Sequence, residues 1–203
     1  MFNFITRKLN KKGNDGPIIE NPNLPPKLIF LDIDGVLNNA NSSVFELCVI
    51  EDELVNLLKE IVDKTGAKIV LSTTWRYTKE TRQMVNDCLI KNQVPLYINC
   101  TPNFGTNRTD EILCWLNENT NFACPDNILS SEQSRNQNDL PLTELKLSTK
   151  LSNIKFIVLD DLDLTKEGNN FSYIGDRFIL VDRTVGLTKD NVELAIKLLN
   201  DIL

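Results

Sequence analysis

Short apolar runs alternate with longer amphipathic stretches along this chain. The runs Leu28–Leu31, Lys68–Leu71 and Ile154–Leu159 are continuous enough to predict strands that are buried on both faces of a sheet. Leu96–Ile98 and Arg177–Val181 are shorter candidates for further strands. Because helical patterns separate these runs, the sequence predicts an α/β fold: a Rossmann-like parallel sheet with helices on both faces.

Four stretches have apolar residues at helical spacing. They predict helices over Glu51–Lys64 and Lys79–Lys91, from a cap at Thr106 or Asn107 to about Asn117, and from a cap at Thr188 to about Asp201. Gly66 stands where the C-cap of the first helix is expected.

Two segments do not follow either pattern. Residues 1–26 are polar and rich in Gly and Pro, which predicts a flexible arm ahead of one domain over residues 27–203. Residues 120–152 are rich in Asn, Ser, Gln and Pro, and we expect an irregular insertion with some helix near Leu142–Leu147. No apolar run approaches the roughly 20 residues of a membrane span.

Polar side chains follow each of the three strong strand candidates. Asp32 and Asp34 follow the first, Ser72 and Thr73 follow the second, and Asp160-Asp161 ends the third. The carboxyl ends of parallel strands lie at one edge of a sheet, so these groups should meet there. Packed carboxylates repel unless a cation joins them, and an oxygen-only ligand set suits Mg²⁺. An Asx turn is a simpler explanation of Asp34-Gly35, but it does not account for Asp32.

Composition narrows the chemistry. The chain has no histidine, which excludes histidine-relay hydrolases and histidine-ligated zinc sites. Its five cysteines are odd in number and none are spaced C-x-x-C, so we expect reduced thiols, mostly in the core, and a cytoplasmic or similarly reducing compartment. The net charge of −6 argues against stable binding to nucleic-acid backbones.

The segments LDIDGVL, LSTTWR and IVLDD occur in this order on successive predicted strands. Together they resemble the haloacid dehalogenase (HAD) superfamily of Rossmann-like phosphohydrolases, whose signature is an apolar strand followed by D-x-D-G. The WR dipeptide and the late stretch RFILVDRTVGLT resemble the HAD branch associated with RNA-repair modules. The resemblance implies a domain with a minimal cap or none, because the chain has little room for one.

The resemblance also implies roles for individual residues. Asp32 would be the nucleophile that forms an aspartyl-phosphate, and Asp34 the general acid and base. Ser72, or Thr73 in its place, would hydrogen-bond the phosphoryl group. A cation should balance the charge of the transition state; Arg108 is the choice here, with Lys146, Lys150 and Lys155 as competitors.

Metal and substrate contacts complete this picture. Asp32 and Asp34 would hold Mg²⁺ with Asp160 or Asp161, and the sequence does not choose between the last two. Arg76 is expected either to hold a substrate anion or to form a surface salt bridge. Asp163 and Asp176 are weaker candidates for the metal, and Trp75 is expected to pack in the core or under a lid.

These expectations describe a Mg²⁺-dependent phosphomonoester hydrolase with an open site for a bulky substrate. The acidic balance favours a phosphoprotein or phosphopeptide. The alternatives are a polynucleotide end phosphatase in nucleic-acid repair, a small-metabolite phosphatase, and a HAD-fold binding module without activity. The oligomeric state is open.

Overall fold

The computed structural model describes residues 27–41, 49–105, 107–119 and 154–201. In them, a five-stranded parallel sheet has the strand order β3-β2-β1-β4-β5. From β1 the chain adds β2 and β3 on one side and then returns to add β4 and β5 on the other. The direction of winding therefore changes between β1 and β4. This is the point at which open α/β sheets usually bind ligands, beyond the carboxyl ends of the strands.

The three central strands are β1 (Leu28–Leu31), β2 (Lys68–Leu71) and β4 (Phe156–Asp160). All of β1 is buried, and its side chains alternate between two separate clusters: Ile29 and Leu31 point into one, Leu28 and Phe30 into the other. A strand covered on both faces explains its continuous apolar sequence.

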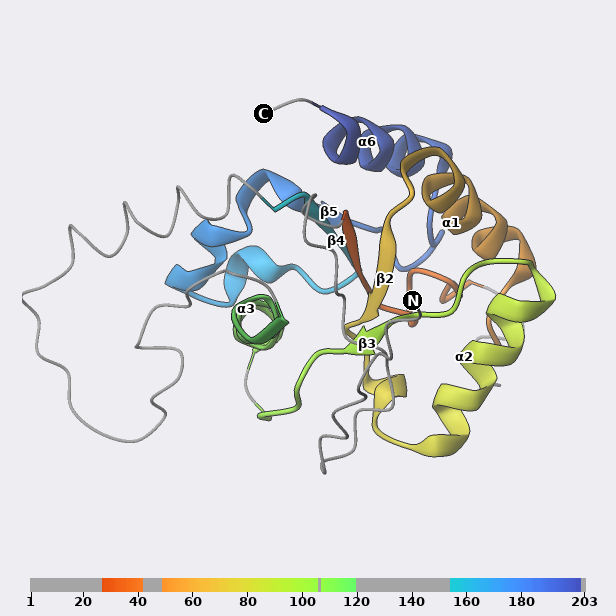
Figure 1. The fold of residues 1–203 in the computed structure, drawn as a ribbon, viewed down its shortest axis with the longest axis horizontal. Helices are drawn as coiled ribbons and strands as arrows, with labels where there is room; N and C mark the ends of the chain where they lie inside the picture. The colour runs from red at the N-terminus through yellow and green to blue at the C-terminus, as the bar shows by residue number, and fades with distance from the viewer. Residues whose placement is uncertain (1–26, 42–48, 106, 120–153, 202–203) are drawn as a thin grey trace, which may run out of the picture.

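Helices cover both faces of the sheet (Figure 1). α1 (Asp52–Thr65), α2 (Lys79–Lys91) and α6 (Lys189–Asn200) contribute to the cluster that contains Ile29, while α3 (Arg108–Asn119) packs on the opposite face. On that face Trp115 of α3 meets Phe30 edge to face, with ring centroids 5.5 Å apart. The predicted α/β class and the two helical layers are confirmed.

Local signals placed most helix ends correctly. Gly66 ends α1 in the left-handed conformation, with φ of 69°. Thr188 begins α6 with a capping box formed with Asn191. Asn107 accepts from the backbone N–H of Asp110 at 2.8 Å and so caps α3, while the alternative, Thr106, lies outside the described residues.

One strand was predicted in the wrong place. β3 is Asn99–Cys100, not Leu96–Ile98. Leu96 is 47% exposed, and the ladder pairs Asn99 with Val70 and Cys100 with Leu71. The apolar run misled the prediction because the residues that pair have a polar side chain and a thiol instead of a β-branched pattern.

The remaining differences lie near the end of the chain. β5 is Phe178–Leu180, shorter than the predicted run, and three short 3-10 helices over residues 164–177 were not predicted. The predicted arm (1–26), the insertion (120–152) and its helix near Leu142–Leu147 lie outside the described residues. None of the helices in the described residues has both the length and the apolar character needed to cross a membrane.

Candidate active site

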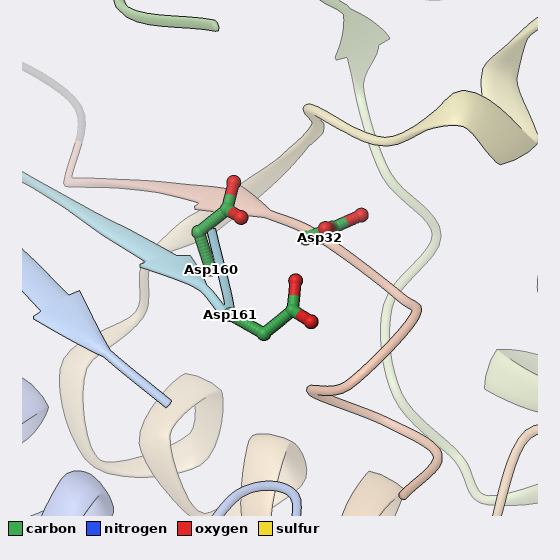
Figure 2. A group of neighbouring side chains, drawn as sticks. All are labelled: Asp32, Asp160 and Asp161. Atoms are coloured by element: carbon green, nitrogen blue, oxygen red, sulfur yellow. The ribbon is translucent and has the colours of Figure 1, made fainter. Parts of the chain in front are cut away.

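Three carboxylates meet where the sheet changes its direction of winding. Asp32 directly follows β1, Asp160 is the last residue of β4, and Asp161 follows it (Figure 2). The register brings Asp32 and Asp160 side by side, because Leu31 pairs with Leu159 and the Asp32 N–H donates to the Leu159 carbonyl at 3.0 Å. One ligand oxygen from each of the three acids lies within 4.8 Å of the others. The group could hold a metal ion.

Arg108, the first residue of α3, lies between two of these acids. Its Nη1 is 2.9 Å from Asp32 Oδ2 and 2.6 Å from Asp160 Oδ2, and its side chain is only 13% exposed. The start of α3 is held by Glu167, whose two carboxylate oxygens accept from the backbone N–H groups of Arg108 and Thr109 at 3.1 and 2.8 Å. Arg108, the cation chosen from the sequence, therefore reaches the acidic cluster. The sequence prediction did not identify Glu167 as a second acceptor at the start of α3, beside the cap Asn107.

The electrostatics of the cluster follow from burial and crowding. The pKa of the Asp160 carboxyl is raised to about 8, first by burial and then by the charge of Asp32, while Arg108 opposes the rise. Burial and Asp32 also raise the pKa of Asp161. Burial alone would lower the pKa of Arg108, but the charges of Asp32 and Asp160 outweigh it, so that pKa is raised. Three crowded carboxyl groups with one arginine are short of positive charge, which a divalent cation would supply.

Gly35 makes room for Asp161. Its φ is +72°, and a Cβ added there would lie 2.5 Å from Asp161 Oδ2 and 2.7 Å from its Cβ. Only glycine meets both demands at once. Asp161 is also approached by the exposed Arg183, whose Nε lies 3.8 Å from Asp161 Oδ2. The D-x-D-G pattern thus has a steric reason for its glycine beyond the turn.

Asp34 lies outside the group of three carboxylates in the described residues. Its Oδ2 accepts from Trp75 Nε1 at 2.9 Å and its Oδ1 from Asn38 Nδ2 at 3.1 Å. Asn38 is fully buried, and its Oδ1 also accepts from the Gly35 N–H at 2.8 Å. Asn38 and Trp75 therefore fix the direction of the Asp34 carboxylate. Asn38 could not be recognised from the sequence, because a buried asparagine cannot be told from an exposed one in a polar loop.

The two hydroxyls after β2 differ in their surroundings. Ser72 is fully buried beside β1, where its N–H donates to the Leu31 carbonyl at 2.8 Å. Within the described residues, Ser72 Oγ has no hydrogen-bond partner. Thr73 Oγ1 instead accepts from the Trp75 N–H at 3.4 Å and so caps the 3-10 helix Thr74–Arg76. A buried hydroxyl without a partner is costly, so Ser72 is the better placed of the two to meet an external oxygen.

Arg76 is buried rather than on the surface, and its partners are protein groups. Its Nη2 contacts Glu111 Oε2 at 2.6 Å and the Pro102 carbonyl at 3.1 Å, and its Nε donates to the Thr101 carbonyl at 3.1 Å. It also donates to the Thr73 carbonyl. The prediction of a surface salt bridge is therefore wrong, because the salt bridge that Arg76 forms is buried. We propose that Arg76 holds the loops after β2 and β3 together instead of binding substrate.

The other candidates lie elsewhere. Lys155 precedes β4, at the opposite edge of the sheet, and donates to the Asp201 carbonyl. Asp163 accepts a hydrogen bond from the Thr165 hydroxyl and forms a salt bridge with Lys166. Asp176 lies in a 3-10 helix and is not among the described residues that form the acidic cluster. Lys146 and Lys150 lie outside the described residues.

One of three comparisons with known proteins found a match. Residues 28–192 match the model of one family, described as the HAD domain in Swiss Army Knife RNA repair proteins. A search of the curated proteins found no match, and neither did a search of the solved structures. The matched region contains both strand ends of the acidic cluster and the whole sheet. The chain therefore belongs to the family of HAD domains that occur in Swiss Army Knife RNA repair proteins.

Proposed function

We propose that this chain is a Mg²⁺-dependent phosphomonoesterase that removes the terminal phosphate from a nucleic-acid end. The observation that carries the proposal is the group of Asp32, Asp160 and Asp161 with Arg108, at the carboxyl edge of a HAD-domain sheet. An anion and a divalent cation can both bind there, because one arginine and three carboxyl groups offer partners to each.

Asp32 is the proposed nucleophile. One of its oxygens attacks phosphorus, the bond from phosphorus to the leaving oxygen breaks, and an aspartyl-phosphate forms. Asp34 gives its proton to the leaving oxygen and later takes a proton from the water that attacks the same phosphorus. This second attack releases inorganic phosphate and restores the Asp32 carboxylate. The hydrogen bonds of Asp34 to Trp75 and Asn38 would hold it for these two transfers.

Arg108 and Ser72 are the proposed phosphate contacts. Arg108 already contacts Asp32 and is therefore within reach of a phosphoryl group bonded to that residue. Ser72 Oγ, which lacks a partner in the described residues, would donate to a phosphoryl oxygen. Asp32, Asp160 and Asp161 are the proposed Mg²⁺ ligands, and the bound ion would offset the repulsion between Asp32 and the phosphate dianion. At ~4 Å and an effective dielectric near 20, one such like-charge pair costs about 4 kcal/mol.

The family description favours a nucleic-acid end over the phosphoprotein that the acidic composition suggested. That expectation came from the net charge of −6, which bears on binding along a nucleic-acid backbone. Hydrolysis of one terminal phosphate needs only local contacts. The link to RNA repair in the family description is the specific observation that favours a nucleic-acid end as the substrate.

A substrate panel tests the proposal. The purified full chain is incubated with Mg²⁺ and with oligonucleotides that carry a 3′- or a 5′-phosphate, a phosphopeptide, and an aryl phosphate, and released phosphate is measured. We expect phosphate release from an oligonucleotide end at the highest kcat/KM, and none from Asp32→Asn. Preference for the phosphopeptide would restore the phosphoprotein alternative. No release from any substrate would favour a binding module on the HAD fold.

A further inference from the structure

We propose that Tyr77 and Phe104 form a stacking platform for the bases next to the terminal phosphate of a nucleic-acid end. This inference rests on the proposed function and names how its substrate would be recognised. Tyr77 is 49% exposed and Phe104 is 52% exposed. Aromatic residues usually bury most of their surface, so two half-exposed rings on adjoining loops call for an explanation.

Both rings belong to loops at the edge of the sheet that carries the acidic cluster. Tyr77 follows the 3-10 helix after β2, and Trp75 of that helix donates to Asp34 at 2.9 Å. Phe104 follows β3 and stands four positions before Arg108, which contacts Asp32. The two loops touch, because Tyr77 Oη donates to Asn103 Oδ1 at 3.4 Å. The platform therefore lies on the β2–β3 side of the proposed phosphate site.

A buried ion pair holds these loops in place. The side chains of Arg76 and Glu111 are only 3% and 5% exposed, and they meet at 2.6 Å. Glu111 uses its other oxygen to accept from the Phe104 N–H at 3.1 Å, and Arg76 bonds the carbonyls of Thr101 and Pro102. A buried pair gains little net stability after desolvation, so its positional effect on both loops is the more informative property.

The Arg76 guanidinium also stacks on the Tyr77 ring, 4.8 Å from its centroid. This contact orients the ring in advance, so less conformational entropy would be lost when a base stacks on it. Arg76 and Glu111 thus anchor Tyr77 and Phe104, yet each aromatic residue remains about half exposed to solvent.

The net charge of the chain favours bases, and not backbone phosphates, as the groups that bind to Tyr77 and Phe104. A chain with net charge −6 has little general attraction for backbone phosphates, so a nucleic-acid ligand needs another source of affinity. Stacking on aromatic rings supplies such affinity without regard to base identity. We therefore expect recognition of an end with weak sequence preference and a shallow dependence on salt.

Binding by the Asp32→Asn chain tests the platform without turnover. Its Kd is measured for a fluorescent oligonucleotide that carries a terminal phosphate, and for the same strand with abasic sites at the two nucleotides next to the phosphate. Tyr77→Ala and Phe104→Ala are added singly to Asp32→Asn, with Tyr77→Phe as the conservative variant. Leu194→Ala on α6, which removes an apolar side chain of similar exposure (43%), is the matched control.

Each alanine should weaken binding of the intact strand by about 5- to 150-fold, which is the usual range for one stacked base. The same alanines should change binding of the abasic strand less than twofold, and Tyr77→Phe and Leu194→Ala should bind as Asp32→Asn does. Equal losses for intact and abasic strands would overturn the platform, as would no loss for either. Tighter binding of a phosphopeptide that depends on both rings would also overturn it.

The two proposals fail in different ways. If the wild-type chain releases no phosphate but the base-dependent losses appear, the platform stands and the phosphatase does not. If phosphate is released and the alanines change neither Kd nor KM, the phosphatase stands and the platform does not. Oligoribonucleotide and oligodeoxyribonucleotide arms of the same experiment distinguish RNA from DNA ends.

Discussion

Two arginines are buried near the carboxyl edge of the sheet, and they are bound in different ways. Arg76 pairs with one carboxylate, Glu111, and gives its remaining hydrogen bonds to backbone carbonyls. Arg108 meets two carboxylates, Asp32 and Asp160, through a single nitrogen. The first arrangement is balanced in charge, while the second has more acid than base.

The difference indicates which arginine can exchange partners. Displacing Glu111 from Arg76 would leave an unpaired buried charge, which is strongly unfavourable. Displacing a carboxylate from Arg108 is easier if a phosphate takes its place and a cation joins Asp32, Asp160 and Asp161. A local excess of carboxyl groups therefore distinguishes a reactive site from a structural ion pair better than burial does.

Asp32, one of the two acids that Arg108 contacts, should have the largest effect on turnover. We expect Asp32→Asn to lower kcat by more than about a thousandfold, because removing a covalent nucleophile removes the step and not only its stabilisation. Phosphate release from an aryl phosphate measures it. Asp63→Asn on α1, which breaks an exposed pair with Lys59, is the control and should keep full activity. An Asp32→Asn chain with more than a tenth of wild-type kcat would remove the nucleophile assignment.

Breaking the balanced pair should lower stability. We expect Arg76→Met to reduce the free energy of unfolding by about 3–5 kcal/mol, because the Glu111 carboxylate would stay buried without a countercharge. Chemical denaturation measures this change. Lys91→Met is the control: it breaks an ion pair to Asp52 in which both side chains are about half exposed or more, and solvent screening leaves such a pair little effect on stability. Equal losses in the two variants would contradict the contrast.

Breaking the unbalanced pair should instead lower activity. We expect Arg108→Ala to reduce kcat by about 100- to 1,000-fold, the usual cost of losing one group that stabilises transition-state charge. Lys155→Ala removes the competing cation from the opposite edge of the sheet and should leave kcat unchanged. If Lys155→Ala abolishes turnover and Arg108→Ala does not, the cation was misassigned.

The sequence was sufficient for the features that depend on local pattern. The buried strands β1, β2 and β4 could be predicted because a strand covered on both faces needs a continuous apolar run, and the polar residues at their carboxyl ends stand out where each run stops. Arg108 was a choice among four cations, since nothing in a linear sequence shows which helix begins at the acidic cluster. Asn38, Glu167 and the platform formed by Tyr77 and Phe104 could not be found, because their roles depend on contacts between separate loops.

A substitution at Gly35 can displace Asp161, the third acid of the cluster, and leave its carboxylate chemically unchanged. In Gly35→Ala, the new Cβ would collide with the Asp161 carboxylate, so we expect Mg²⁺ affinity to fall by about 10- to 100-fold, as when metal ligands lose their positioning. Titration calorimetry measures it. Gly66→Ala is matched in backbone strain, with φ of 69° against 72°, but its Cβ meets nothing within 4 Å. Equal Mg²⁺ affinity in the two variants would exclude the proposed contact.

The charge excess should also appear in stability as a function of pH and Mg²⁺. Because the pKa of Asp160 is raised in the fold, its contribution to the free energy of unfolding is fully present below its ordinary pKa of 3.8 and is lost as the pH rises towards about 8. Bound Mg²⁺ favours the ionised acids, so it should raise the Tm by a few degrees at about pH 8 and little at about pH 5. Differential scanning calorimetry with Mg²⁺ or with a chelator measures both effects. Asp160→Asn should flatten the pH dependence of the metal-free protein, because its side chain does not ionise. A Mg²⁺ shift of equal size at both pH values would mean that the ion binds away from these carboxylates.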